Sequence, residues 1–371
     1  MTKVCHMTSA HPPEDVRIFH KECVSLAQAG YEVYLVERGE SYSKDGVNIV
    51  GVGEISGSRY RRMTVGAKVV YKVALDLNCD IYHVHDPELL PYCLKLKRKG
   101  KKVVFDSHEL TREQILGKHY LPKFAIRLIS KLYAAYEDYV LKRIDGVIFP
   151  CTINGSFPLP GKRKVLLNNV PRLTELYDHY DPEATKEPNT ICTVGSLTYD
   201  RGIKHLVIAA HRAGCKAILA GRIIPKDFET ELLQMPESKN AVFLGQINRE
   251  QVQAVYARSM VGVSSILNRM QYDMAENLPT KVYEFMAMGL PVVLSRNSFN
   301  ESMIQKYQFG ICADPENTDE LAAAIKELLD NPEKSKELGR NGRKAVQSVF
   351  NWEHEQEKLL ELYNHLQVAE S

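Results

Sequence analysis

The chain of 371 residues lacks several features that would assign it to a specialised class of protein. No apolar run approaches the ~20 residues that a membrane-spanning helix needs. The opening "MTKVCHM" passes directly into a strand-like pattern, so we expect no signal peptide. There is no internal repeat and no low-complexity tail. We therefore expect a soluble, cytoplasmic protein, and the length predicts two domains, each with its own core.

Metal-binding cysteine motifs and a strong net charge are also missing. None of the eight cysteines forms a Cys-x-x-Cys pair, and most lie in apolar segments, as reduced and buried thiols do. The formal net charge is only +2, although the first half of the chain is basic and the second half acidic. This modest charge, without a known binding motif, argues against nucleic acid as a partner. The basic half would suit an anionic lipid surface or a phosphorylated substrate.

Short apolar runs rich in β-branched residues alternate with helical stretches along the whole chain. This alternation predicts α/β domains with parallel, doubly wound sheets. Between the two halves, residues 171–188 are rich in proline and charge and are typical of a linker. Two such domains would face each other across a cleft, and ligands would bind beyond the carboxyl ends of the strands. The predicted strands are KVCHM, YEVYLVE, NIVGV, DIYHVH, KVVFDSH, DGVIF and KVLLN, then TICTVG, KAILAG, AVFLG, VGVSS, PVVLS and FGICA.

The loops after the second-half strands carry residues that suit a ligand with phosphates and hydroxyl groups. Gly195 is the last residue of the predicted strand TICTVG and allows a ligand to approach the backbone. Arg201 then precedes a predicted helix, and Arg222 follows the strand KAILAG. Arginines and helix N-termini bind phosphate groups, so this edge of the second sheet is a candidate anion site.

One stretch, "AENLPTKVYEFMAMGLPVVLS", places two carboxylates around a helix start. Glu276 and Glu284 are eight positions apart, and Pro279 between them fits the first turn of a helix that ends near Gly289. Lys281 lies three residues before Glu284 and shares a face with it. Carboxylates suit sugar hydroxyls and the helix start suits an anion. The alternative is a surface helix with a solvated Lys–Glu pair.

In the first half, polar residues follow the strands as well. His85 and His108 come after two strands and indicate a polar floor of a cleft. Alternatively, His85 and Asp86 cap the helix that follows. The first loop, "TSAHPPEDVRIFHKE", offers Asp15 and Arg17 but no glycine, which argues against a dinucleotide-binding loop in this half.

With these residues in view, the chain resembles the family 4 glycosyltransferases of the GT-B type. The resemblance implies two Rossmann-like, doubly wound domains, an E-x7-E element, and retaining transfer of a sugar from a nucleotide-diphosphate donor. It also implies that the terminal helix returns to the first domain. The expected organisation is residues 1–170 with 353–371 as the acceptor-side domain, 171–188 as linker and 189–352 as the donor domain. The segments that carry the resemblance are "VGSLTYDRGI", "LAGRI", "VFLGQI", "AENLPTKVYEFMAMGLPVV" and "FNWEHEQEKLLELY".

The same resemblance implies roles for individual residues. Glu276 and His108 are expected near the transferred sugar, Arg201 and Lys281 on the diphosphate, and Glu284 on the ribose hydroxyls. We take the first four as candidate catalytic residues and Glu284 as a donor contact. The remaining candidates are Gly195, Ser196, Arg222, Leu244, Asn277, Leu278, Pro279 and Thr280 for the donor, and Asp15, Arg17 and His85 on the acceptor side.

Two departures from the family pattern matter. Ser196 stands where the family often has an arginine, so phosphate binding should depend more on Arg201 and Lys281. The family's first loop often carries glycines, whereas this chain has "HPPEDVR", which leaves the acceptor open.

No Asp-x-Asp sequence, the metal-holding element of many glycosyltransferases of another fold, occurs in the chain. The protein itself must then supply the positive charge, so we expect neither a required metal nor another cofactor.

The sequence indicates the donor, the acceptor and the cellular location less directly. UDP sugars are the expected donors by family frequency, with GDP sugars next, and the acceptor is a saccharide or a lipid-linked saccharide, as in polysaccharide biosynthesis. Residues 58–75 predict a helix on which Arg61, Arg62, Lys68 and Lys72 flank valines. Such a helix would place the protein peripherally on the anionic inner face of a membrane, or it is simply a solvated basic face.

Two other classes of function remain open at this point. A non-hydrolysing nucleotide-sugar epimerase would bind a similar donor and convert it without an acceptor. A non-catalytic protein that binds sugar nucleotides or glycans would keep the fold without turnover.

Overall fold

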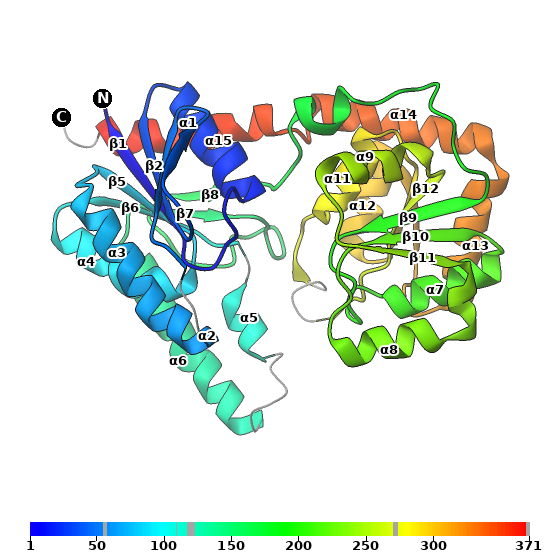
Figure 1. The fold of residues 1–371 in the computed structure, drawn as a ribbon, viewed down its shortest axis with the longest axis horizontal. Coiled ribbons are helices and arrows are strands. Elements are labelled where there is room, and N and C mark those ends of the chain that lie inside the picture. Colours follow the sequence, from blue (N-terminus) through cyan, green and yellow to red (C-terminus); the bar gives the residue numbers. More distant parts are fainter. Residues whose placement is uncertain (55–57, 109, 117–122, 270–273, 369–371) are drawn as a thin grey trace. The chain divides into compact units, whose positions relative to one another are not determined.

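The computed structural model describes residues 1–54, 58–108, 110–116, 123–269 and 274–368. The chain forms two compact units, Met1–Asn169 with His354–Ser371, and Val170–Glu353 (Figure 1). We refer to them as unit 1 and unit 2. Each contains a largely parallel sheet with helices, so the predicted α/β, doubly wound fold class is confirmed. No helix in the described part of the chain is both long and apolar enough to cross a bilayer.

Unit 1 is built on an eight-stranded sheet in the order β3-β4-β2-β1-β5-β6-β7-β8. Strand β3 pairs antiparallel with β4, and the other pairs are parallel. Seven of the strands match predicted ones. Strand β3 was not predicted, because its three residues are exposed and do not form an apolar run. The strands are β1 (Lys3–Met7), β2 (Glu32–Glu37), β3 (Tyr42–Lys44), β4 (Val47–Gly51), β5 (Ile81–Val84), β6 (Lys102–Asp106), β7 (Gly146–Phe149) and β8 (Lys164–Leu166).

The two faces of this sheet differ in chemistry. Met7 on β1 and Val84 on β5 belong to the apolar core that α3 and α4 cover. Because strand residues alternate between faces, His6 and His83 lie on the opposite face. The helices of unit 1 are η1 (Val16–Cys23), α1 (Val24–Gln28), α2 (Arg59–Arg61), η2 (Arg62–Gly66), α3 (Ala67–Asp76), η3 (Pro87–Leu89), α4 (Leu90–Arg98), α5 (Thr111–Leu116), α6 (Lys123–Leu141) and, from His354 on, α15 (Trp352–Val368).

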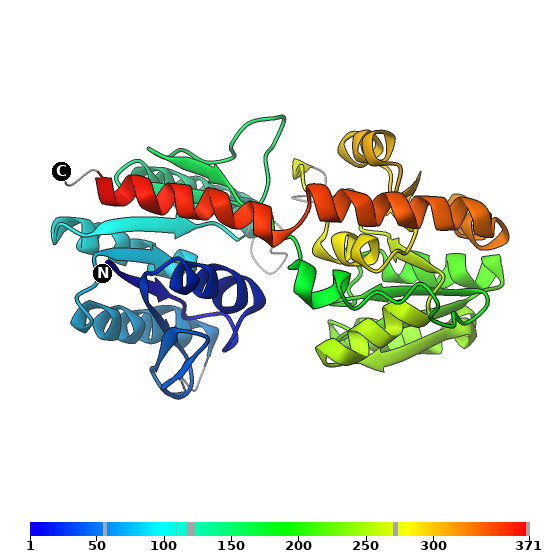
Figure 2. The same cartoon turned by 90° about the horizontal axis from the view of Figure 1, so that it is seen from above.

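The C-terminal helix α15 completes unit 1 and runs along it in both views (Figure 1, Figure 2). Its Glu355 carboxylate accepts a hydrogen bond from the backbone N–H of Asn168. A side chain at Gly146 of β7 would meet Leu362 at 3.2 Å, so the helix packs tightly on the sheet. The hydroxyl of Tyr363, which is fully buried, lies 2.9 Å from His83 Nδ1.

Unit 2 contains a six-stranded parallel sheet in the order β11-β10-β9-β12-β13-β14. The chain order reverses at β9, so the loops after β9 and β12 leave the sheet at a topological switch point, where ligands of such sheets bind. All six strands were predicted. They are β9 (Thr190–Val194), β10 (Lys216–Ala220), β11 (Ala241–Gly245), β12 (Val261–Ser264), β13 (Val292–Ser295) and β14 (Gly310–Ala313).

The stretch expected as a linker packs as part of unit 2. Within residues 170–188, Leu176 is fully buried, and the Tyr177 carbonyl accepts a hydrogen bond from Arg343 on α14. The helices of unit 2 are η4 (Leu173–Tyr177), α7 (Ile203–Ala213), α8 (Lys226–Gln234), η5 (Pro236–Asn240), α9 (Arg249–Arg258), α11 (Thr280–Ala287), α12 (Ser298–Tyr307), α13 (Thr318–Asp330) and α14 (Pro332–Ser348).

Candidate functional site

Two glycines shape the strand ends at the switch point of unit 2. Gly195 follows β9 with φ of 115°, and Gly221 follows β10 with φ of 140°. A side chain at Gly221 would meet the carbonyl oxygen of Gly195 at 1.9 Å, so the two backbones can pack directly only because glycine is present. The result is an open backbone surface at the carboxyl ends of β9 and β10.

Two cations converge on this surface. A Cβ placed on Gly195 would lie 3.3 Å from Arg201 Nη1 and 3.9 Å from Lys281 Cε. Lys281 is 7% exposed, and its Nζ donates to Thr193 Oγ1 at 3.1 Å. Burial, together with the nearby Arg201 charge, lowers the pKa of Lys281 to about 7. Two cationic groups held together in this way favour a bound anion, which would restore the full charge of the lysine.

The helix starts beside these cations have no side-chain cap. Helix α7 begins after Gly202, and α11 begins after Pro279, and neither of these residues caps with a side chain. The first N–H groups of a helix carry partial positive charge and bind anions. Pro279 was expected inside the first turn and stands one position earlier, as the N-cap. Gly289 ends the helix region with φ of 65°, as expected.

Glu284 is held in a fixed orientation inside unit 2. It is 8% exposed, its Oε1 accepts from Arg249 Nη1 at 2.7 Å, and its Oε2 accepts from Tyr256 Oη at 2.6 Å. The alternative of a solvated Lys281–Glu284 pair is therefore wrong. A carboxylate has about four lone-pair positions, so Glu284 retains acceptor capacity for a hydroxyl group. Arg249 and Tyr256 could not be predicted as partners of Glu284, because nothing in a single sequence pairs them with a residue about 30 positions later.

The other candidate donor residues lie around these groups with different exposure. Glu276 is half-buried just before α11, and residues 270–273 ahead of it lie outside the described part. Leu278 is 2% exposed and belongs, like the half-buried Leu244, to the apolar core of unit 2. Half-buried positions are also held by Asn277, Pro279 and Thr280, while Ser196 and Arg222 are exposed.

In unit 1, two expected acceptor-side residues form hydrogen bonds within the protein. Arg17 is 4% exposed and donates through Nε and Nη2 to both oxygens of Asp106, at 2.9 and 3.0 Å. Its Nη1 donates to the Leu167 carbonyl at 3.0 Å. Asp15 caps the start of η1 by accepting from the backbone N–H groups of Arg17 and Ile18. Arg17 thus positions Asp106 and would have to break these bonds to reach an acceptor.

The two histidines that were expected to meet at the strand ends are in contact. His85 Nδ1 lies 3.0 Å from His108 Nε2, and Asp106 Oδ2 lies 3.4 Å from the same nitrogen. His85 is buried, whereas the His108 side chain is 17% exposed. Burial lowers the pKa of His108, so this imidazole is neutral near pH 7.

Asp86 stands at the N-cap position of η3, but its side chain makes no capping hydrogen bond, so the alternative of a side-chain cap is wrong. Its carboxylate instead accepts from Thr8 Oγ1 at 2.9 Å and from the Ser9 N–H at 2.6 Å. It also forms an ion pair with His11, at 3.0 Å. These contacts fix the first loop of unit 1 against the end of β5.

Comparison with known families covers both units. The family Glycosyl transferases group 1 matches residues 178–345, and Glycosyltransferase Family 4 matches residues 17–153. Together the two ranges take in most of the chain, which belongs to the family 4 type of GT-B glycosyltransferases. The resemblance inferred from the sequence is thereby confirmed.

Individual relatives are more distant. Spore coat protein SA of Bacillus subtilis strain 168 is 30% identical over 128 residues, 34% of this chain, and the match spans only 32% of that relative. Sucrose-phosphate synthase of Thermosynechococcus elongatus superposes with a TM-score of 0.79 at 18% identity, covering 100% of both chains. HepE of Anabaena, solved with UDP and glucose, gives a TM-score of 0.72 at 12% identity, covering 98% of this chain and 100% of that chain. At such identities the solved structures show the shared GT-B fold.

Proposed function

We propose that the protein is a retaining glycosyltransferase that moves a sugar from a nucleotide-diphosphate sugar to a saccharide or lipid-linked acceptor. The observation that carries the proposal is the convergence of Arg201 and Lys281 on Gly195 at the switch point of unit 2. A diphosphate is the anion that fits two cations beside an uncapped helix start. HepE was solved with UDP and glucose, which supports UDP sugars ahead of GDP sugars as the donor.

Each group around the diphosphate has a separate task in this proposal. Breaking the bond to the transferred sugar leaves negative charge on the diphosphate, which Arg201, Lys281 and the N–H groups at the start of α11 stabilise. Glu276 binds hydroxyls of the transferred sugar. Glu284, oriented by Arg249 and Tyr256, accepts hydrogen bonds from the ribose hydroxyls. Retention of the anomeric configuration is carried over from the family.

Further residues are proposed as donor contacts and as groups on the acceptor side. Ser196, Arg222, Leu244 and the segment 277–280 surround the diphosphate and the nucleoside. In unit 1, His108 is the residue whose neutral imidazole reaches the surface, and we propose that it lies near the reacting sugar. Asp15 is a further candidate on the acceptor side.

Binding and turnover test this proposal together. UDP at about a hundred times its dissociation constant should stabilise the protein by about 2.7 kcal/mol, which a thermal-shift assay detects as a raised melting temperature. A UDP sugar should release UDP in proportion to the glycosylated acceptor formed. Conversion of the donor to an epimer without any acceptor would favour the epimerase, and binding without any turnover would favour a sugar-nucleotide-binding protein.

Sugar transfer should not depend on an added metal ion. Because Arg201, Lys281 and helix N–H groups supply the positive charge, we expect the native enzyme to keep its activity during a brief assay in excess EDTA. The measurement is the initial rate with and without the chelator. Complete loss of activity in EDTA, restored by manganese, would contradict this assignment.

We further propose that unit 1 attaches to an anionic membrane through α2, η2 and α3. Tyr60 and Val65 expose 77% and 48% of their surface, and Arg61, Lys68 and Lys72 are exposed beside them. The side chain of Arg62, the fourth basic residue predicted here, lies outside the described part. Apolar residues next to basic ones suit the interface of an anionic bilayer.

Vesicle co-sedimentation at moderate salt measures this attachment. The protein should sediment with vesicles that contain phosphatidylserine and remain in solution with vesicles of phosphatidylcholine. Combining Lys68→Glu with Lys72→Glu should weaken binding at least about tenfold, because each basic residue near the surface contributes about 1 kcal/mol. Lys326→Glu with Lys336→Glu, two exposed lysines of unit 2, serves as the control and should bind as the wild type does. Equal behaviour of both double variants, or no binding by the wild type, means a solvated basic face.

A further inference from the structure

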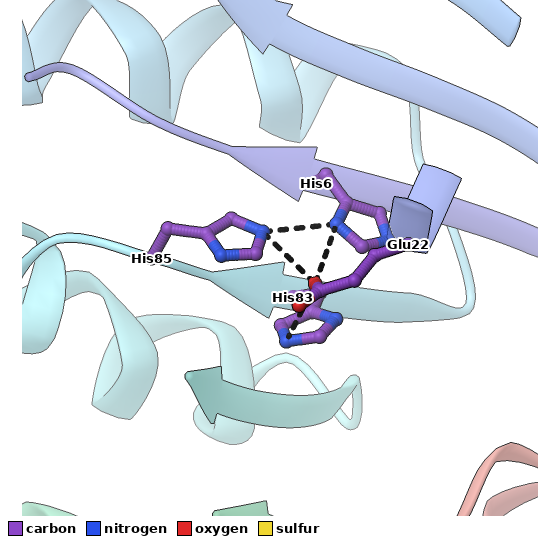
Figure 3. A group of neighbouring side chains, drawn as sticks. All are labelled: His6, Glu22, His83 and His85. Carbon is purple, nitrogen blue, oxygen red and sulfur yellow. Dashed lines mark hydrogen bonds and ion pairs between the residues drawn. The ribbon is translucent and has the colours of Figure 1, made fainter. Parts of the chain in front are cut away.

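Three histidines and a glutamate of unit 1 meet at β1 and β5, the strands between which the strand order reverses. His6 on β1 stands directly opposite His83 on β5 in the sheet register. His85 follows two residues later and therefore points to the same face. Glu22 reaches the three rings from helix η1, as Figure 3 shows.

The distances within this His3Glu cluster suit a single small cation. His6 Nδ1 lies 2.9 Å from His85 Nε2. Glu22 Oε2 lies 4.0 Å from His6 Nδ1, 3.9 Å from His83 Nε2 and 4.0 Å from His85 Nε2. One donor atom from each residue lies within 4.8 Å of the others. A tetrahedral zinc ion with bonds of about 2.0–2.2 Å spaces its ligand atoms ~3.3–3.6 Å apart, so small side-chain movements would close the cluster around it.

Two of the four side chains, Glu22 and His83, have buried atoms without a hydrogen-bond partner among the described residues. All four side chains have 0% exposure. Among the described residues, nothing donates a hydrogen bond to either oxygen of Glu22, and His83 Nε2 has no hydrogen-bond partner. A buried carboxylate without donors is costly and calls for an ion or a proton.

The cluster is also short of positive charge. Arg17 binds Asp106 through two hydrogen bonds, and its Nε lies 3.1 Å from Glu22 Oε1, so one guanidinium faces two carboxylates. Burial lowers the pKa values of His6 and His83 well below their ordinary value, so these imidazoles are neutral near pH 7. Neutral imidazole is the form that binds a metal. Burial and the neighbouring Asp106 raise the pKa of Glu22 well above its ordinary value, so a dication would displace the proton that this carboxyl group otherwise holds.

In each histidine of the cluster, the ring nitrogen that faces away from Glu22 has a partner that holds the imidazole in place. His83 Nδ1 and His6 Nε2 lie 2.9 and 3.5 Å from the hydroxyl of Tyr363 on α15. His85 Nδ1 lies 3.0 Å from His108 Nε2. In metal sites the second nitrogen of a ligating histidine is held in the same manner, because this contact fixes the tautomer and the ring orientation.

We propose that His6, His83, His85 and Glu22 form a closed structural site for a divalent transition metal ion, with Zn²⁺ as the best-suited ion. Three imidazole nitrogens and one carboxylate oxygen are donors that zinc accepts in tetrahedral geometry. Complete burial leaves no position for a substrate, so the ion stabilises unit 1 by joining β1, β5 and η1. The diphosphate-binding residues belong to unit 2, whereas within unit 1 the cluster adjoins the proposed transfer residues through the contact of His85 with His108.

Metal analysis of the purified wild type is the first measurement. The protein, produced with an affinity tag that contains no histidine, should contain one equivalent of a transition metal per chain after gel filtration. Unfolding it with a chelator and refolding it with Co²⁺ should give the visible absorption bands of four-coordinate cobalt. Refolding with Zn²⁺ should raise the melting temperature above that of protein refolded without metal.

Isosteric variants assign the metal to these residues. Glu22→Gln preserves size and removes the anionic ligand, so metal content should fall about tenfold or more. Glu37→Gln, which changes another buried carboxylate of unit 1 outside the cluster, should retain the wild-type metal content. If Glu22→Gln does not fold, the cobalt spectrum of the wild type still decides. A wild type with neither bound metal nor cobalt bands overturns the proposal, as does a Glu22→Gln variant with full metal content. In either case the cluster would be held by shared protons.

Discussion

Replacing Glu276 by alanine is expected to reduce sugar transfer by about 10²- to 10³-fold while the affinity for free UDP stays near that of the wild type. Glu276 lies just before the uncapped N-terminus of α11. We propose that it contacts the transferred sugar, where charge changes most in the transition state. An interaction made mainly in the transition state affects kcat and hardly affects binding of a ligand that lacks the sugar. Initial rates and calorimetric titration with UDP measure the two effects separately.

Glu284→Ala is the matched comparison for this experiment, because the second carboxylate should act on binding. Loss of its charged hydrogen bonds to the ribose should weaken UDP binding by about 1.5–3 kcal/mol. The change also deprives Arg249 and Tyr256 of their acceptor, so the melting temperature of each variant must be recorded. Tyr256→Phe removes only the hydrogen bond from Tyr256 to Glu284 and controls for that loss. Near-normal turnover of Glu276→Ala, or wild-type UDP affinity of Glu284→Ala, would contradict the respective role.

UDP affinity of the wild type should fall about tenfold per pH unit above pH 7, and Lys281→Met should abolish this dependence. The pKa of Lys281 in the free protein is lowered to about 7 by burial and by Arg201. Below about pH 7 the lysine already carries its charge, whereas above it the diphosphate must bind together with a proton. At low pH the variant should bind UDP about 10- to 100-fold more weakly, because a charged hydrogen bond is lost.

Proton uptake on binding is the direct measurement of this effect. Titration with UDP at about pH 8, in two buffers of different ionisation enthalpy, should show nearly one proton taken up by the wild type and none by Lys281→Met. Lys186→Met is the control, since Lys186 is a second lysine of unit 2 whose pKa is lowered by burial, and its Nζ donates to the Ser259 carbonyl instead. A UDP affinity of the wild type that stays constant between about pH 7 and 9 would mean that Lys281 does not bind the diphosphate.

The sheets could be predicted from the sequence because strands buried on both faces need continuous apolar runs. Strand β3 escaped this reasoning, since the exposed segment Tyr42–Lys44 has no such run. The helix after Pro279 was also predictable from local turn chemistry. Whether its polar face lay in solvent was not, because helical spacing states which residues share a face and not what covers that face. The burial of Lys281 and Glu284 depends on β9 and α9, which the periodicity of α11 does not report.

The histidine cluster shows the same limit for contacts between distant segments. The spacing of His83 and His85 on one strand indicates that both side chains point to one face. Their meeting with His6, about 77 residues earlier in the chain, requires the register between β1 and β5. That register is a property of the whole sheet, so the single sequence indicated a polar strand end at His85 and gave no sign of the buried group.

The position of helix α15 has a consequence for how the protein matures on the ribosome. The strands of unit 1 precede unit 2 in the chain, but the helix that supplies Leu362 and Tyr363 to their sheet is synthesised after unit 2. Until all of unit 2 has been translated, the face of the N-terminal sheet that carries η1 therefore lacks the contacts of α15. Domains generally fold as units during synthesis, so unit 2 can complete its core first. A polypeptide released before α15 would expose the polar face around His83, which makes truncated products ready substrates for proteolysis.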